Sequence, residues 1–61
     1  MIEQERYYTV KELSKYWKVS ERTITRIINR QEIPVLKVGR QFRIQGQSIL
    51  EYEARNVNIP E

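Results

Sequence analysis

Residues 10–44 contain two short helical patterns followed by a strand-like alternation, and this order limits the fold more than any other feature of the sequence. The first helix should begin after Thr9, because a threonine followed three residues later by a glutamate, here Glu12, is the signature of a capping box. It should extend to Trp17. The apolar residues at helical spacing, expected to share one face, are Val10, Leu13, Tyr16 and Trp17.

A second helix is predicted from Glu21 to Arg30, with Ser20 as its N-cap. The turn before it is Lys18-Val19-Ser20, in which Val19 is expected to contact the core. Pro34 ends the helical region, because proline disfavours the α conformation in the residue that precedes it. The stripe expected to be buried consists of Ile24, Ile27 and Ile28.

Alternating residues from 35 to 44 predict a β-hairpin. A three-residue loop, Gly39-Arg40-Gln41, places Arg40 at the tip and leaves Lys37 and Arg43 together on one face. The apolar pairs on the other face would be Val38 with Phe42 and Leu36 with Ile44. A two-residue loop would mix apolar and polar side chains on each face, so the three-residue loop is favoured.

The remaining segments complete one domain over residues 1–61. Residues 1–6 are expected to form a flexible arm, and Tyr7 and Tyr8 either add a strand to the hairpin or cover the core. A third helix is predicted from about Gln47 to Arg55 with Gly46 as N-cap, and residues 56–61 form a flexible tail. The predicted fold class is α+β: a small winged helix-turn-helix with a two-stranded β-hairpin wing and a C-terminal helix.

Composition argues against an enzyme and against a metal site. The 61 residues include no cysteine and no histidine, which removes the usual nucleophiles, general bases and zinc ligands. We therefore expect no catalytic residue, no metal and no cofactor. No apolar run reaches the roughly 20 residues of a membrane span, and the polar, acidic N-terminus does not resemble a signal peptide. The expected location is the cytoplasm.

Charge is distributed unevenly along the chain. The net charge is +3, but residues 15–43 hold eight basic and two acidic residues, which amounts to +6. The remainder holds three basic and six acidic residues, which amounts to −3. A basic middle segment between acidic ends is typical of a face that binds a polyanion, although chance clustering on a solvated surface would look the same.

The second helix carries side chains suited to contacting DNA bases, because arginine pairs with guanine, asparagine with adenine, and a threonine methyl meets a thymine methyl. An ordinary solvated face would mix glutamate and lysine at i,i+4 spacing, and the one acid here, Glu21, suits the first helical turn. The predicted DNA contacts of this recognition helix are Ser20, Arg22, Thr23, Thr25, Arg26, Asn29 and Arg30. Those of the wing are Lys37, Arg40, Gln41 and Arg43, whose basic members would also protect an exposed strand from aggregation.

Four motifs in this order resemble the excisionase/MerR-like winged-helix family over about residues 7–55. They are Tyr8-Thr9-Val10-Lys11-Glu12-Leu13, Val19-Ser20-Glu21-Arg22-Thr23-Ile24, Ile33-Pro34-Val35, and Val38-Gly39-Arg40-Gln41-Phe42-Arg43-Ile44. Two departures affect the helix ends: Lys18 and Gln31 stand where the family commonly has glycine. A left-handed conformation at either would cost about 1 kcal/mol or more. Gln45 also replaces a common proline after the wing.

The resemblance implies a DNA-binding module whose short members are often excisionases, which bind repeated sites, bend DNA and assist a tyrosine recombinase. The implied partners are double-stranded DNA, a tyrosine recombinase (integrase) and other copies of the chain along DNA. A small transcriptional repressor with the same fold is the main alternative, because it needs the same groove contacts. A protein-interaction adaptor is a third possibility, and it predicts no salt-sensitive DNA binding.

Overall fold

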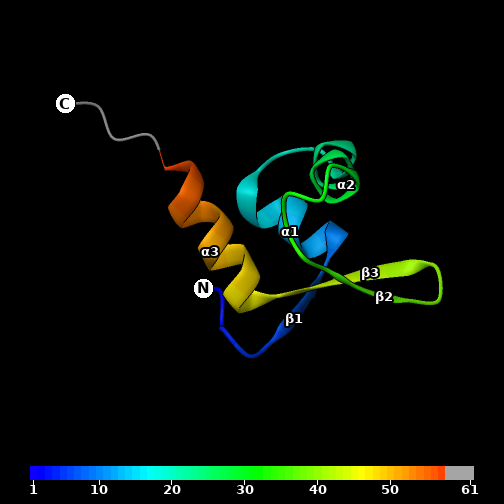
Figure 1. Cartoon of the computed structure of the whole chain (residues 1–61), viewed down its shortest axis with the longest axis horizontal. Helices are drawn as coiled ribbons and strands as arrows, with labels where there is room; N and C mark the ends of the chain where they lie inside the picture. The colour runs from blue at the N-terminus through cyan, green and yellow to red at the C-terminus, as the bar shows by residue number, and fades with distance from the viewer. Residues whose placement is uncertain (58–61) are drawn as a thin grey trace.

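The computed structural model describes residues 1–57 and has the predicted α+β arrangement of a winged helix-turn-helix (Figure 1). In the described part of the chain, the elements follow in the order β1 (Tyr7–Thr9), α1 (Val10–Trp17), α2 (Glu21–Asn29), β2 (Leu36–Val38), β3 (Gln41–Gln45) and α3 (Gly46–Asn56). Helices α1 and α2 pack against each other, and α3 continues directly from β3. Of the predicted tail, residues 58–61 lie outside the described residues.

The sheet has three antiparallel strands in the order β1-β3-β2, so that β1 widens the predicted two-stranded wing. Tyr8 of β1 is paired with Ile44 of β3, and both are buried. Tyr7, its neighbour, is exposed on the other face of the sheet. Both alternatives for the tyrosine pair therefore occur together: it forms a strand, and one of its members covers the core.

The predicted hairpin register is wrong. Val38 pairs with Gln41 and Lys37 with Phe42, which leaves a two-residue loop, Gly39-Arg40, instead of a three-residue loop. Gly39 has a φ of 61°, and a positive φ at the first of the two loop residues is what a type II′ turn requires. Because of this register, Leu36 and Val38 lie on the outer face of the sheet and are 51% and 54% exposed.

Both helices of the predicted helix-turn-helix begin as expected. The Thr9 hydroxyl accepts from the N–H of Glu12, whose carboxylate accepts from the N–H of Thr9, so the capping box is complete. The Ser20 hydroxyl accepts from the N–H of Thr23 at the start of α2. The hydrophobic core is formed by Ile2, Tyr8, Leu13, Ile24, Ile28, Ile33, Ile44 and Ile49.

Two apolar residues predicted to be in the core are exposed. Tyr16 is 46% exposed, because at 100° per residue it lies about 120° around the helix from Val10. Ser14 is buried in its place and satisfies its hydroxyl by donating to the carbonyl of Lys11. Val19 is 39% exposed and does not plug the turn, and Ile27 is half-buried at the edge of the core.

The N-terminal residues are folded back onto the start of α3. Ile2 is buried, and the carbonyls of Arg6 and Gln4 accept from the N–H groups of Gly46 and Gln47. Gln45, not Gly46, is the N-cap, and its side chain makes no capping bond, so these carbonyls satisfy the first donors of α3. A side chain on Gly46 would overlap the Glu3 carbonyl, which explains the glycine.

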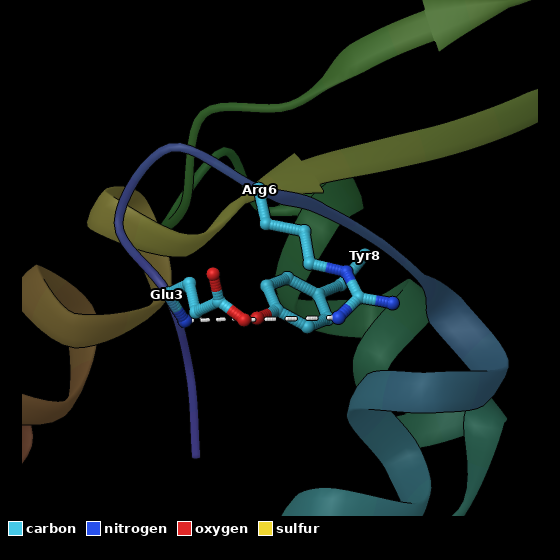
Figure 2. A network of polar contacts seen from close by, with 3 residues as sticks. All are labelled: Glu3, Arg6 and Tyr8. Atoms are coloured by element: carbon cyan, nitrogen blue, oxygen red, sulfur yellow. Dashed lines mark hydrogen bonds and ion pairs between the residues drawn. The ribbon is translucent and has the colours of Figure 1, made fainter.

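A small polar network holds this N-terminal fold (Figure 2). The N–H of Glu3 donates to the Tyr8 hydroxyl at 2.8 Å, and the Arg6 guanidinium lies 3.8 Å from the Glu3 carboxylate and over the Tyr8 ring. The prediction of a flexible arm over residues 1–6 did not include these contacts.

A residue with left-handed backbone follows each helix of the helix-turn-helix: Lys18 is the C-cap of α1, and Gln31 comes one residue after Arg30, the C-cap of α2. Lys18 has φ 60° and Gln31 has φ 59°, at the two positions where the resembling family commonly has glycine. The backbone at these two positions thus has the left-handed conformation that glycine favours, although neither residue is glycine. The steric penalty for an L-residue in this conformation is about 1–2 kcal/mol.

Replacing Lys18 with glycine should stabilise the protein. Relief of the steric penalty exceeds the extra backbone entropy that glycine has in the unfolded chain, so the free energy of unfolding should rise by about 0.5–1 kcal/mol in urea denaturation. Lys15→Gly, within α1, is the matched control and should lower it by about 1 kcal/mol. A loss of stability in Lys18→Gly would mean that Lys18 is not strained.

Candidate nucleic-acid interface

The exposed face of α2 carries polar and basic side chains that line one shallow depression. Its lining residues are Arg22, Thr25, Arg26, Asn29 and Arg30. They lie opposite the buried Ile24 and Ile28, because residues three and four positions apart share a side of a helix. All five were predicted as recognition-helix contacts, and the structure brings them together.

A second groove, of about 500 Å³, separates α2 from the hairpin. Three parts of the chain line it: the residues around the start of α1 (Thr9, Val10, Lys11), the α2 residues Glu21 and Thr25, and Arg40–Arg43 of the hairpin. Thr25 also lines the depression on α2, so the two hollows adjoin at this residue. In Figure 1 the hairpin projects from the body of the protein on the side of α2, and α3 lies on the other side.

The combined surface is strongly basic. The two hollows are lined by six basic side chains and one acidic side chain: Lys11, Arg22, Arg26, Arg30, Arg40 and Arg43, with Glu21. Among residues 1–57, the only ion pair joins Arg6 to Glu3, which do not line either hollow. None of the basic side chains on this surface forms an ion pair with a carboxylate of the described residues, and their positive charges are available to a polyanion.

The hairpin does not present its polar side chains on one face as predicted. Lys37 lies opposite Phe42, with its ammonium 5.8 Å from the centre of the ring, and it lines neither hollow. Arg43 points to the other face, where its guanidinium donates to the Gln41 side chain at 2.7 Å and to the Phe42 carbonyl at 3.1 Å. Arg40, Gln41 and Arg43 all line the groove, so three of the four predicted wing residues lie there.

Ser20 and Thr23, also predicted as contacts, lie at the start of α2 and line neither hollow. Their hydroxyls are 3.0 Å apart and hydrogen-bonded to each other, in addition to the capping bond. The hydroxyl groups of Ser20 and Thr23 therefore take part in capping α2. A role for the two residues in DNA contact remains a prediction.

Five residues that line the groove were not predicted as contacts: the polar or charged Thr9, Lys11 and Glu21, and the apolar Val10 and Phe42. Lys11 was counted with the acidic N-terminal segment, although it is exposed at the start of α1. It reaches the groove because β1, directly before α1, pairs with β3 of the hairpin and brings Thr9 opposite Arg43. A predicted pairing of the Tyr7-Tyr8 segment with β3 would have indicated this.

Helix α3 holds the far end of α2 in place. Just beyond α2, the carbonyl of Glu32 accepts from the Arg55 guanidinium at 3.0 Å, and its carboxylate accepts from the Tyr52 hydroxyl at 3.4 Å. Burial and the neighbouring Glu32 carboxylate raise the pKa of Tyr52 above its ordinary value. The Trp17 indole N–H donates to Glu53 at 2.7 Å, which ties α1 to the same helix.

The family model described as "Helix-turn-helix domain" matches residues 7–57, which is most of the chain. The chain belongs to this helix-turn-helix domain family. It is also 34% identical over 41 residues to proteins from two strains of Mycobacterium tuberculosis (CDC 1551 / Oshkosh and H37Rv), each named as a candidate DNA-binding protein. These matches cover 67% of this chain and 53% of each relative, so the aligned region spans about half of their length. No solved structure matches the chain.

Among the described residues, no group of three or more acidic, histidine or cysteine side chains is placed to hold a metal ion. In the same part of the chain, none of the helices has the length and apolar character needed to cross a membrane.

Arg40→Ala should weaken DNA binding without unfolding the protein, because Arg40 is an exposed loop residue at the edge of the groove. The loss should be about fivefold in affinity, corresponding to about 1 kcal/mol for one phosphate contact. Lys37→Ala removes the same charge from an exposed hairpin residue that lines neither hollow, and it should cost less. Titrations of both variants on one duplex measure this, and equal losses would contradict the placement of the groove in the interface.

Proposed function

We propose that this helix-turn-helix domain binds duplex DNA sequence-specifically, with α2 in the major groove and the hairpin beside it against the sugar-phosphate backbone. The observation that carries this proposal is the basic surface formed by the α2 depression and the adjoining groove between α2 and the hairpin. A major groove about 12 Å wide admits one α-helix, and α2 is the helix whose exposed face carries this surface.

Within this proposal the side chains have different tasks. Arg22, Arg26 and Asn29 are suited to contact base edges, because guanidinium and amide groups form paired hydrogen bonds with guanine and adenine. Arg30, Arg40 and Lys11 lie toward the margins and are suited to phosphate contacts, which fix the orientation of the protein on the duplex. We propose a binding module and not an enzyme, and DNA as its ligand.

Salt dependence tests duplex binding directly. Contacts to about 4–6 phosphates give a slope of about −4 to −5 for the logarithm of the affinity against the logarithm of the salt concentration. Titrations of a labelled duplex between low and moderate salt measure the slope. Binding that scarcely changes with salt would contradict the proposal and favour a protein-interaction adaptor.

We further propose that the DNA site is part of a recombination reaction, in which the chain acts as an excisionase that bends DNA and assists a tyrosine recombinase. The four motifs and their spacing support this role, since they resemble the excisionase/MerR-like pattern. Several copies bound along repeated sites belong to the same proposal. The marked exposure of the hairpin leaves its loop free to follow the backbone of a curved duplex.

A footprinting experiment separates this role from transcriptional repression. On DNA that carries the host element's attachment site and its promoters, an excisionase protects repeated sites beside the attachment core and stimulates excision when the recombinase is added. A repressor protects the promoter and leaves excision unchanged. Protection of the promoter alone would therefore overturn the excisionase proposal and leave duplex binding intact.

A further inference from the structure

Glu21 is the one acidic side chain in the linings of the two basic hollows. It is exposed and lies in the groove between α2 and the hairpin, together with Thr25, Arg40 and Gln41. A carboxylate at such a place opposes phosphate binding, since it repels the negative charge of the backbone. Attraction to phosphate therefore cannot explain why an acidic side chain occupies this position.

Helix capping does not supply that reason. In α1 the corresponding first-turn acid, Glu12, accepts from the N–H of Thr9 at 2.9 Å, and this hydrogen bond holds the pKa of Glu12 below its usual value. In α2 the capping partner of Ser20 is Thr23. Among residues 1–57 the Glu21 carboxylate has no hydrogen bond and no ion pair, so both of its oxygens are free to accept. A favourable interaction with the helix dipole remains, but it does not depend on the groove.

The position of Glu21 suits contact with a base. It is the first residue of α2, and the N-terminal residues of a recognition helix are those that contact base edges. Thr25 lies one turn later on the same side of the helix, since residues i and i+4 are neighbours, and it lines both hollows. Glu21 thus extends the row of base-contacting side chains toward the hairpin.

We propose that Glu21 determines sequence specificity by accepting a hydrogen bond from the exocyclic N4 amino group of a cytosine in the major groove. Cytosine presents only a donor there, from which a carboxylate can accept a hydrogen bond, whereas guanine and thymine present acceptors that would repel it. Adenine presents a donor, N6, beside an acceptor, N7, and the N7 atom would repel the second carboxylate oxygen. This proposal rests on the proposed duplex binding by α2. It assigns the cytosine to the end of the site nearest the hairpin.

Selection from a randomised duplex library, with the full chain, tests this role. Glu21→Gln keeps the shape of the side chain but adds a donor, and glutamine pairs with both N6 and N7 of adenine. We expect wild-type protein to prefer cytosine at one position by about tenfold, and Glu21→Gln to prefer adenine at that same position. Glu21→Ala should lose the preference there and keep the others. Glu5→Gln, an exposed residue that does not line the groove, is the matched control and should select the wild-type site.

Two results would overturn the role of Glu21 while leaving sequence-specific binding in place. In one, Glu21→Gln and Glu21→Ala select the same site as wild type. In the other, Glu21→Ala binds all duplexes more tightly by the same factor, which would make Glu21 a source of phosphate repulsion only. A wild-type protein that binds duplexes but prefers no base at any position would instead overturn the proposed sequence-specific function. Melting curves of each variant exclude a change in folding as the cause.

Discussion

β3 pairs with a strand on each side while its core face packs against the helices, and Ile44 is the residue that joins the pairing with β1 to the core. It is fully buried, it lies opposite Tyr8 of β1, and it belongs to the same core as Leu13 and Ile24. A chain of this size buries only about 60% of its unfolded surface, so few residues carry the stability of the whole fold. The position of the hairpin relative to α2, and hence the shape of the groove between them, depends on the packing of this strand.

Local signals predicted much of the fold. The capping box at Thr9 and Glu12 and the N-cap at Ser20 place the starts of α1 and α2, because both motifs act within one helical turn. The exposed face of α2 followed from the buried stripe opposite it, so the central part of the candidate site, Arg22 to Arg30, could also be predicted. These features need no information about distant segments.

The features that were not predicted depend on how the strands pair. The hairpin prediction assumed that Leu36 and Val38 share the core face with Phe42, whereas the two-residue turn at Gly39 places both on the outer face. Here the preference of a short hairpin loop for a type II′ turn outweighs the binary pattern. Lys11 joins the groove through the pairing of β1 with β3. The β-prone Tyr7-Tyr8 pair allowed such a strand, but it fixed neither the partner strand nor the register.

The left-handed backbone at Lys18 and Gln31 has a consequence for the lifetime of the protein in a cell. Each left-handed residue lowers the free energy of unfolding by about 1–2 kcal/mol. The whole free energy of unfolding is only about 0.05–0.15 kcal/mol per residue in folded proteins. A ligand that binds only the folded state adds about 2.7 kcal/mol when its concentration is 100 times its dissociation constant. Molecules bound to DNA would then be folded far more persistently than free molecules, and proteases that act on unfolded chains would remove mainly the unbound copies.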